Sequence, residues 1–407
     1  MNNFIMKTSV LFLAAAMVMA ACTSQPSSDK FEITLPGEDR NDTDFYDAVK
    51  SVEVVDFEID SNFIHTDECE LLVSDNYYYF VEFGIPQFGR KSRLACYDKA
   101  TGKMMFSRTM DGRSRAECTS IRNWFVKGDN IVLNDGGLLK MYNHTGKFLG
   151  TLNDTALWVN LLLPFGNGYI ACDFDGSIYS DDKGLTLFDS SFNAGESFFV
   201  VPESYRPFAN SSVGNSSPNI YIFNDTLRFC VQNSFNLHSF PGDKTYRFIP
   251  SNPLPESMKT KQQVTDISFT LTCLEKEYAT SISGLVENQD FIMFRYWMGR
   301  KIFHVLLSKS DNKVYGFNES NIKNYSSERI KAPFDIWKIF IGNSSILYSD
   351  GKYFYARCNK RVIDILKDYK NVFNDLQRAV YDTMQSRLAR NADNEFEYFY
   401  LKIKFSK

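Results

Sequence analysis

Two arginines and a glutamate lie close together in one short segment that begins with glycine, and they are the clearest candidates for chemistry in the chain. Arg113, Arg115 and Glu117 belong to the segment Gly112–Glu117 (GRSRAE). A guanidinium group can hold a carboxylate, a phosphate or a uronate through two parallel hydrogen bonds. The same residues could instead form an exposed ion pair that fixes a turn, and such pairs add little stability. The segment therefore predicts either a ligand-binding loop or a structural turn.

Sequence patterns typical of catalysis or metal binding are not found. The chain has no GxSxG, HExxH or phosphate-binding glycine motif. Its four histidines are scattered and no two cysteines have CxxC spacing, so we predict no metal site and no cofactor. Most cysteines lie in apolar runs, which favours buried hydrophobic residues, although an exported protein could form a disulfide. Carboxylates are plentiful, but the sequence alone does not identify a catalytic pair among them.

The N-terminus indicates lipid attachment. Lys7 precedes the apolar run Ser9–Ala21, which is too short to span a bilayer comfortably. Small residues stand directly before Cys22, as in the bacterial lipobox, where the new N-terminal cysteine carries the lipid. We predict a signal peptide over residues 1–21, acyl chains such as palmitate on Cys22, and a lipid-anchored polar tether over residues 22–50. The alternative is an ordinary secretory signal with an incidental cysteine.

Short strands joined by tight turns must position the candidate loop. Four apolar or alternating runs lie between residues 121 and 152, separated by glycine and Asx residues that suit hairpin turns. A unit of this kind has the size of one propeller blade. A Thr-Gly-Lys hairpin occurs at Thr101–Lys103 and again 44 residues later at Thr145–Lys147, which indicates an internal repeat of blade length.

The remaining runs fit six units better than seven. We therefore predict an all-β fold over residues 51–407, a six-bladed β-propeller of four-stranded antiparallel blades, with seven blades as the alternative. Ser51–Phe57 is expected to close the ring beside the C-terminal blade, and the sixth blade is expected to begin with a strand at Ile336–Ile341. Apolar steps of three and four residues predict an amphipathic helix from Arg361 to Leu388, packed on the rim within a helical insertion at about 359–391.

These features resemble the six-bladed β-propeller lipoproteins of Bacteroides-type bacteria. The resemblance is carried by the lipobox at Cys22, the segment Gly112–Glu117, the hairpin Asn143–Leu149 and the tripeptide Ala392–Asn394. In that family the first loop usually reads Gly-Arg-Gly-Pro-Gly-Glu, so the three residues between Arg113 and Glu117 depart from the pattern. Glu395 replaces the family's proline after Asp-Asn. The resemblance implies the fold and the location, and it leaves the activity open.

The predicted function is that of a membrane-anchored exported lipoprotein. Such a protein would act as a binding or scaffold module for a glycan, a peptide or an envelope protein. The alternative is an envelope hydrolase or lyase that acts on a glycan or peptide. The net charge of -4 gives no basic field for nucleic acid, so no nucleic-acid partner is expected. The stretch after Cys22 has no acidic run, which favours the outer membrane facing the periplasm over the cell surface.

Several other side chains could contact ligands or modifying enzymes. Asp-Thr-Ala and Asp-Thr-Leu tripeptides are similar to the O-glycosylation sequon of such bacteria, which makes Thr155 and Thr226 the candidate modified residues. Aromatic residues in strands could stack on sugars if they were exposed, although such residues more often belong to the core. The aromatic candidates are Tyr77, Tyr79, Tyr296 and Trp297.

Overall fold

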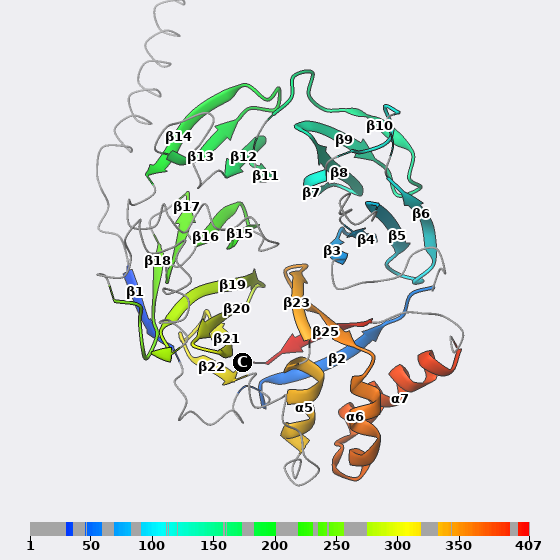
Figure 1. Cartoon of the computed structure of the whole chain (residues 1–407), viewed down its shortest axis with the longest axis vertical. Helices are drawn as coiled ribbons and strands as arrows, with labels where there is room; N and C mark the ends of the chain where they lie inside the picture. The colour runs from blue at the N-terminus through cyan, green and yellow to red at the C-terminus, as the bar shows by residue number, and fades with distance from the viewer. Residues whose placement is uncertain are drawn as a thin grey trace, which may run out of the picture.

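Six β-sheets stand as blades around a central axis (Figure 1). The computed structural model describes residues 30–35, 45, 47–58, 69–82, 91–110, 112, 114–119, 121–157, 159, 161–172, 183–200, 219–230, 235–241, 244–255, 275–318, 333–342, 344–390 and 398–406. Each sheet contains four antiparallel strands, which confirms the predicted six-bladed propeller and excludes the seven-bladed alternative.

The blades are numbered here in chain order, with their strands given from the axis outward. Blade 1 consists of β3 (Cys69–Val73), β4 (Tyr77–Glu82), β5 (Arg93–Asp98) and β6 (Met104–Thr109). Blade 2 consists of β7 (Ile121–Lys127), β8 (Asn130–Asp135), β9 (Leu138–Tyr142) and β10 (Phe148–Thr151). Blade 3 consists of β11 (Leu161–Phe165), β12 (Gly168–Cys172), β13 (Lys183–Phe188) and β14 (Ala194–Val200).

The second half of the ring continues in the same way. Blade 4 consists of β15 (Asn219–Phe223), β16 (Thr226–Cys230), β17 (Asn236–Phe240) and β18 (Thr245–Ile249). Blade 5 consists of β19 (Ala279–Glu287), β20 (Phe291–Met298), β21 (Lys301–Ser308) and β22 (Val314–Asn318). Blade 6 consists of β23 (Ser344–Ser349), β24 (Phe354–Asn359), β25 (Tyr398–Phe405) and, outermost, β2 (Val49–Val55).

The first strand of the propeller domain, β2, closes the ring as predicted. β2 pairs antiparallel with β25, with Val52 opposite Ile403 and Val54 opposite Leu401. Val52 and Ile403 are both buried in the core shared by the strands and helices of blade 6. Because the first and last parts of the propeller pair within one sheet, blade 6 holds both ends of the ring together.

The predicted polar tether contains one further strand. β1 (Lys30–Thr34) pairs parallel with β18 and forms a fifth strand on the outer edge of blade 4. Ile33 is buried against this blade, and the Lys244 ammonium lies 4.7 Å from the ring centre of Phe31. The alternation Phe31, Ile33, Leu35 is a strand pattern, and the polar composition of the surrounding residues concealed it.

The predicted strand at Ile336–Ile341 is wrong, because these residues belong to a helix. They form part of α5 (Pro333–Gly342), which packs against blade 6. Ile336, Ile339 and Phe340 are fully buried, and they follow the spacing of one helical face. A short apolar run does not distinguish a buried strand from a buried helix. Pro333, which suits the first position of a helix, was the overlooked signal.

The predicted C-terminal helix exists but is broken into three parts. These are α6 (Val362–Leu366), the 3₁₀ turn η4 (Lys367–Val372) and α7 (Asp375–Arg390). The break falls at Asn374, where the Asn374 side chain accepts from the Gln377 N–H at 2.8 Å and the Gln377 side chain accepts from the Asn374 N–H at 3.0 Å. This reciprocal capping starts a new helix.

The helical segment packs on the rim of blade 6, as predicted. All of its predicted apolar positions are buried or half-buried, and five of them belong to the core that also contains β2 and β25. Arg387 of α7 donates from Nη1 to the carbonyl of Val55 at 2.5 Å, so the last helix also holds the end of the closing strand.

Candidate functional site

The two sides of the ring differ in the lengths of their loops. From β2 onward, strands that end on one side are joined by short turns of at most five residues, as in 99–103, 143–147 and 350–353. Strands that end on the other side are joined by segments that reach lengths of 29 and 38 residues, as in 250–278 and 360–397. We call these the turn side and the connection side. Insertions gathered on one side of a repeat fold are where recognition usually develops.

The predicted loop Gly112–Glu117 lies on the connection side, between blades 1 and 2. Its end is fixed to blade 2, because Lys140 donates to the carbonyl of Glu117 and, at 2.7 Å, to the Asp135 carboxylate. Asp135 also accepts from the N–H of Thr119 at 2.8 Å. The loop is therefore anchored at its C-terminal end by a buried lysine–aspartate pair.

Glu117 forms the turn itself. Its carboxylate accepts the N–H of Ser114 at 2.9 Å, and this hydrogen bond is the main reason why the pKa of Glu117 is lowered, with the charges of Arg108 and Lys140 adding to the effect. A Cβ atom at Gly112 would lie 2.0 Å from Oε2 of Glu117, so a larger residue there would displace the carboxylate from this position. Glu117 thus fits the structural alternative better than the ligand-binding one.

Arg115 differs from Glu117 in its surroundings. Its side chain is exposed, and it makes no hydrogen bond or ion pair with another described residue. Arg113 lies outside the described residues. Of the two predicted ligand-binding residues that the structure describes, Arg115 is thus the more exposed.

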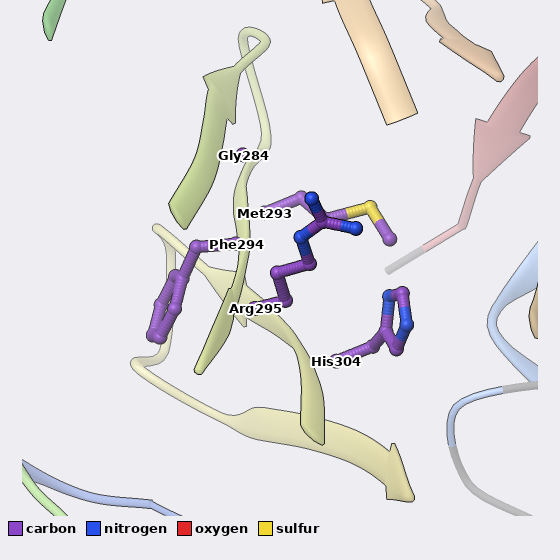
Figure 2. Close-up of a pocket in the computed structure, with 5 residues that line it drawn as sticks. All are labelled: Gly284, Met293, Phe294, Arg295 and His304. Carbon is purple, nitrogen blue, oxygen red and sulfur yellow. The ribbon is translucent and has the colours of Figure 1, made fainter. Parts of the chain in front are cut away.

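A second group of candidate residues surrounds a small pocket on blade 5 (Figure 2). Gly284, Met293, Phe294, Arg295 and His304 line it. Arg295 and His304 are direct partners in the pairing of β20 with β21, so their side chains leave the same face of the sheet. Figure 2 shows both side chains, with Met293, directed away from the side on which Phe294 lies.

Sequence reasoning missed this pair, although one signal could have found it. Gly299 and Arg300 form a two-residue hairpin turn, and Met298 pairs with Lys301. Counting back from such a turn fixes the register and brings Arg295 opposite His304.

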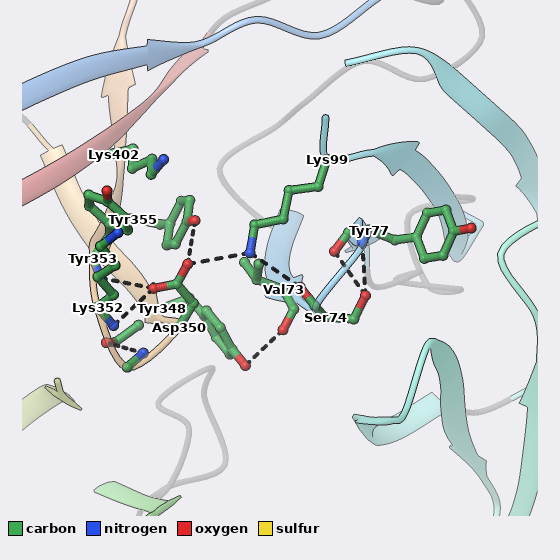
Figure 3. Close-up of polar contacts among 12 residues, drawn as sticks. Val73, Ser74, Tyr77, Lys99, Tyr348, Asp350, Lys352, Tyr353, Tyr355 and Lys402 are labelled. Carbon is green, nitrogen blue, oxygen red and sulfur yellow. Dashed lines mark hydrogen bonds and ion pairs between the residues drawn. The ribbon is translucent and has the colours of Figure 1, made fainter. Parts of the chain in front are cut away.

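The turn side holds the blades together through polar contacts, and the seam between blades 6 and 1 shows how (Figure 3). Asp350 accepts from the Tyr353 N–H at 2.8 Å and from the Tyr355 hydroxyl at 2.8 Å, and it pairs with the Lys99 ammonium of blade 1 at 3.4 Å. Lys99 also donates to the carbonyl of Ser74 at 3.3 Å. These contacts cross the seam next to the closing blade.

The electrostatic environment at this seam favours the ionised form of the Asp350 carboxylate. Burial alone would raise the pKa of Asp350, but hydrogen bonds from Tyr353, Tyr355 and Lys352 and the charge of Lys99 together lower it below its ordinary value. The pKa of Tyr355 is raised, because the phenol is buried and lies beside Tyr78 and Asp350. The seam therefore contains a fixed negative charge.

Near the axis, one carboxyl group has an unusual proton affinity. Burial raises the pKa of Glu70 on β3 to about 7, although the positive charge of Arg357 on β24 opposes the rise. The six cysteines that the structure describes are buried thiols, and burial raises the pKa of Cys96 to about 12 and that of Cys118 to about 11. Such thiols pack as small hydrophobic groups and are poor nucleophiles at neutral pH.

The four predicted aromatic residues differ in how deeply they are buried. Tyr79 and Tyr296 are fully buried core residues, whereas Tyr77 and Trp297 are half-buried. Tyr77 stacks on His144 with ring centres 4.6 Å apart.

The two candidate modified threonines lie on opposite sides of the ring. Thr155 is exposed on the connection side, and half-buried Thr226 begins β16 at a turn. Cys22 lies outside the described residues, so lipid attachment stays a prediction.

Within the described ranges, no three His, Cys, Asp or Glu side chains are grouped so that they could hold a metal ion. None of the helices in the described part of the chain has both the length and the apolar character needed to cross a membrane.

Comparisons with known proteins identify the fold. No family model matches the chain, and no curated protein matches it. A protein from Bacteroides fragilis NCTC 9343 that is assigned as exported has a similar solved structure, with a TM-score of 0.67 and 13% sequence identity over 93% of this chain and 100% of that chain. A member of the DUF4221 family from Bacteroides vulgatus ATCC 8482 matches over 88% of this chain and 99% of that chain, with a TM-score of 0.46 and 8% identity. At these identities the first match supports the propeller fold alone.

Replacement of Asp350 by asparagine should remove a pH-dependent part of the stability. Because the folded-state pKa is lowered, ionised Asp350 stabilises the protein above the unfolded-state pKa of about 3.9, and this contribution is lost as the pH falls through the folded-state pKa. We expect Asp350→Asn to lower the free energy of unfolding at pH 7 by about 1–3 kcal/mol and to weaken its dependence on pH below about 4. Urea unfolding at several pH values measures both. Asp225→Asn, in an exposed turn of blade 4, is the control, and an equal loss in both variants would contradict the assignment.

Substitutions of Glu117 and Arg115 should distinguish a residue that holds the structure of the loop from one that is only exposed to solvent. Glu117→Ala removes the acceptor of the Ser114 N–H, so we expect faster amide exchange at Ser114 and a lower unfolding temperature. Arg115→Ala should change neither quantity, because the side chain is exposed. Hydrogen exchange and thermal melts of both variants check this. Unchanged exchange at Ser114 in Glu117→Ala would exclude the turn-forming role.

Proposed function

We propose that this protein is an exported lipoprotein of the bacterial cell envelope whose propeller serves as a binding or scaffold module. The observation that carries the proposal is the difference between the two sides of the ring. The turn side uses short turns and seam contacts such as Lys99–Asp350, whereas the long connections gather on the opposite side. A rigid frame that carries long segments on one side is the arrangement of a recognition surface.

The proposed ligand is a glycan or a peptide presented in the envelope. Exposed Arg115 lies on the connection side, where a guanidinium group can take a carboxylate or phosphate through two hydrogen bonds. The neighbouring Glu117 holds the shape of the loop that carries Arg115. An envelope protein could dock on the same surface.

The proposed location is the outer membrane, with the protein facing the periplasm and held by acyl chains on Cys22. The leader and the small residues before Cys22 support export and lipid attachment. Only a short segment separates Cys22 from β1, which begins at Lys30 on the outer edge of blade 4. A chain extends at most about 3.3–3.6 Å per residue, so this edge stays close to the lipid surface.

An envelope hydrolase or lyase is the second candidate, and one observation favours it. Glu70 lies on the innermost strand of blade 1 with a pKa raised to about 7, which suits a general acid at neutral pH. Glycoside hydrolysis needs a second carboxyl group about 5–10 Å away, and the spacing distinguishes retaining from inverting enzymes. Binding without turnover supports the first candidate, and turnover of a bound glycan supports the second.

Lipid attachment predicts that Cys22→Ser releases the protein from membranes. Without the thiol no acyl chain can be attached at this position, so the variant should move from the membrane to the soluble fraction. Fractionation of cells that express either form, with metabolic labelling by a palmitate analogue, measures the change. Cys118→Ser, which alters a buried thiol far from the leader, is the control and should stay in the membrane fraction with its label. Retention of unlabelled Cys22→Ser in membranes would refute the anchor.

A glycan and peptide array should identify the ligand and test the loop. We expect the full mature chain to give a reproducible hit, and Arg113→Ala combined with Arg115→Ala to weaken it about tenfold or more, as expected for loss of charge-assisted hydrogen bonds. Arg247→Ala is the matched control, because this exposed arginine pairs with Glu32 on the edge of blade 4. An unchanged hit in the double variant would remove the loop from the binding surface, and the absence of any hit would argue against the binding module.

A further inference from the structure

Three ammonium groups gather around one tyrosine ring on blade 6. The Nζ atom of Lys402 lies 4.0 Å from the ring centre of Tyr353 (Figure 3). The Nζ atoms of Lys352 and Lys404 lie 4.9 and 5.9 Å from the same ring centre. The negative face of an aromatic ring attracts cations, so this ring holds together three like charges that would otherwise repel one another. We call these four residues the lysine cluster.

The register of blade 6 places the cluster on one face of the sheet. Lys402 and Lys404 are two residues apart on β25, so their side chains leave the same face. Lys402 pairs with Tyr355 of β24, and Tyr353 precedes that tyrosine by two residues in the turn between β23 and β24. The N–H of Tyr353 donates to Asp350 at 2.8 Å, which fixes the turn. The cluster therefore lies on the turn side of the ring, next to the seam with blade 1.

The lysine cluster keeps an excess of positive charge. Glu53 of β2 pairs with Lys402 at 3.4 Å, and its side chain is 58% exposed. Within the described part of the chain, neither Lys352 nor Lys404 forms an ion pair. The nearby Asp350 already has an ammonium partner on blade 1. Three ammonium groups and one carboxylate leave two positive charges, and a phosphate monoester dianion can neutralise both of them.

We propose that the lysine cluster binds the phosphate group of a phosphorylated sugar. An ammonium group binds phosphate as a point charge, so several can surround one phosphate without the fixed geometry of a guanidinium fork. Lys352 is exposed and Lys404 is half-buried, so the cluster is open to the surface. Sites for anionic lipid surfaces contain about four to eight basic residues, and three lysines with an acidic neighbour suit a single phosphate better. The sugar part of the inference rests on the proposed binding of a glycan, whereas the phosphate part rests on the cluster alone.

Titration calorimetry on the full mature chain in non-ionic detergent tests the proposal. The probes are glucose 6-phosphate, uncharged glucose, and mixed micelles of the same detergent with phosphatidate. We expect glucose 6-phosphate to bind with a submillimolar Kd at low ionic strength and more weakly in about 0.15 M salt, because salt screens exposed charges. Glucose lacks the charge and should bind more weakly by a factor of about ten or more. The proposal is overturned if glucose 6-phosphate does not bind, if glucose binds as well as its phosphate, or if only the phosphatidate micelles bind, which would assign the cluster to a lipid surface.

Two matched variants assign the binding to the cluster. Lys352→Gln combined with Lys404→Gln removes two charges and should weaken the binding of glucose 6-phosphate about tenfold or more. Lys313→Gln is the control and should leave the Kd unchanged, because this exposed lysine also lies over a tyrosine ring, 4.6 Å from the ring centre of Tyr315 on blade 5. Thermal melts check that each variant is folded. Unchanged affinity in the folded double variant would overturn the assignment, whereas an array hit that depends on Arg115, without binding of glucose 6-phosphate, would contradict this inference alone.

Discussion

The ring depends on buried charged groups that meet their partners only when neighbouring blades pack correctly. The carboxylate of Glu287 is such a group. Its side chain is completely buried at the junction of blades 4 and 5, where it accepts from the Lys309 ammonium at 2.7 Å, the Tyr221 hydroxyl at 2.7 Å and Nε of Arg228 at 3.2 Å. Burying an ion costs several kcal/mol, and only a complete set of partners offsets this cost. Arg228 and Tyr221 come from blade 4 and Glu287 from blade 5, so the partners meet only when the blades are correctly packed.

Similar polar contacts on the turn side fix how neighbouring blades are oriented relative to one another. Asn76 of blade 1 donates to Asp129 of blade 2 at 2.7 Å, and Asp350 of blade 6 meets Lys99 of blade 1 at 3.4 Å. The hydrophobic clusters between blades supply the main driving force, but apolar contacts are non-directional and tolerate sliding. Polar contacts with fixed partners define one angle between neighbouring blades. Once the turn side has fixed the ring, the connection side can carry long segments without weakening it.

The sequence predicted the features that local chemistry determines. Asp98 and Asn143 accept hydrogen bonds from their own turns in blades 1 and 2, which is why the Thr-Gly-Lys repeat marked blade spacing correctly. The closing strand was also predictable, because a ring must pair its first strand. The helix at Ile336–Ile341 was not, since a short run of mostly apolar residues suits a helix or a strand equally and tertiary packing made the choice. The break at Asn374 depends on one reciprocal cap, a signal that the apolar spacing on either side concealed.

Candidate sites were harder to predict than strands because their chemistry depends on pairing across strands. Among the most conspicuous charged residues of the sequence, Glu117 holds its own turn and Arg115 is exposed to water. An exposed guanidinium must give up hydration and side-chain freedom for each contact. It therefore contributes more to the rate of ligand association than to the affinity. Arg295 has less of that freedom, because its Nε donates to the Ser283 hydroxyl and its guanidinium lies over the ring of Trp297.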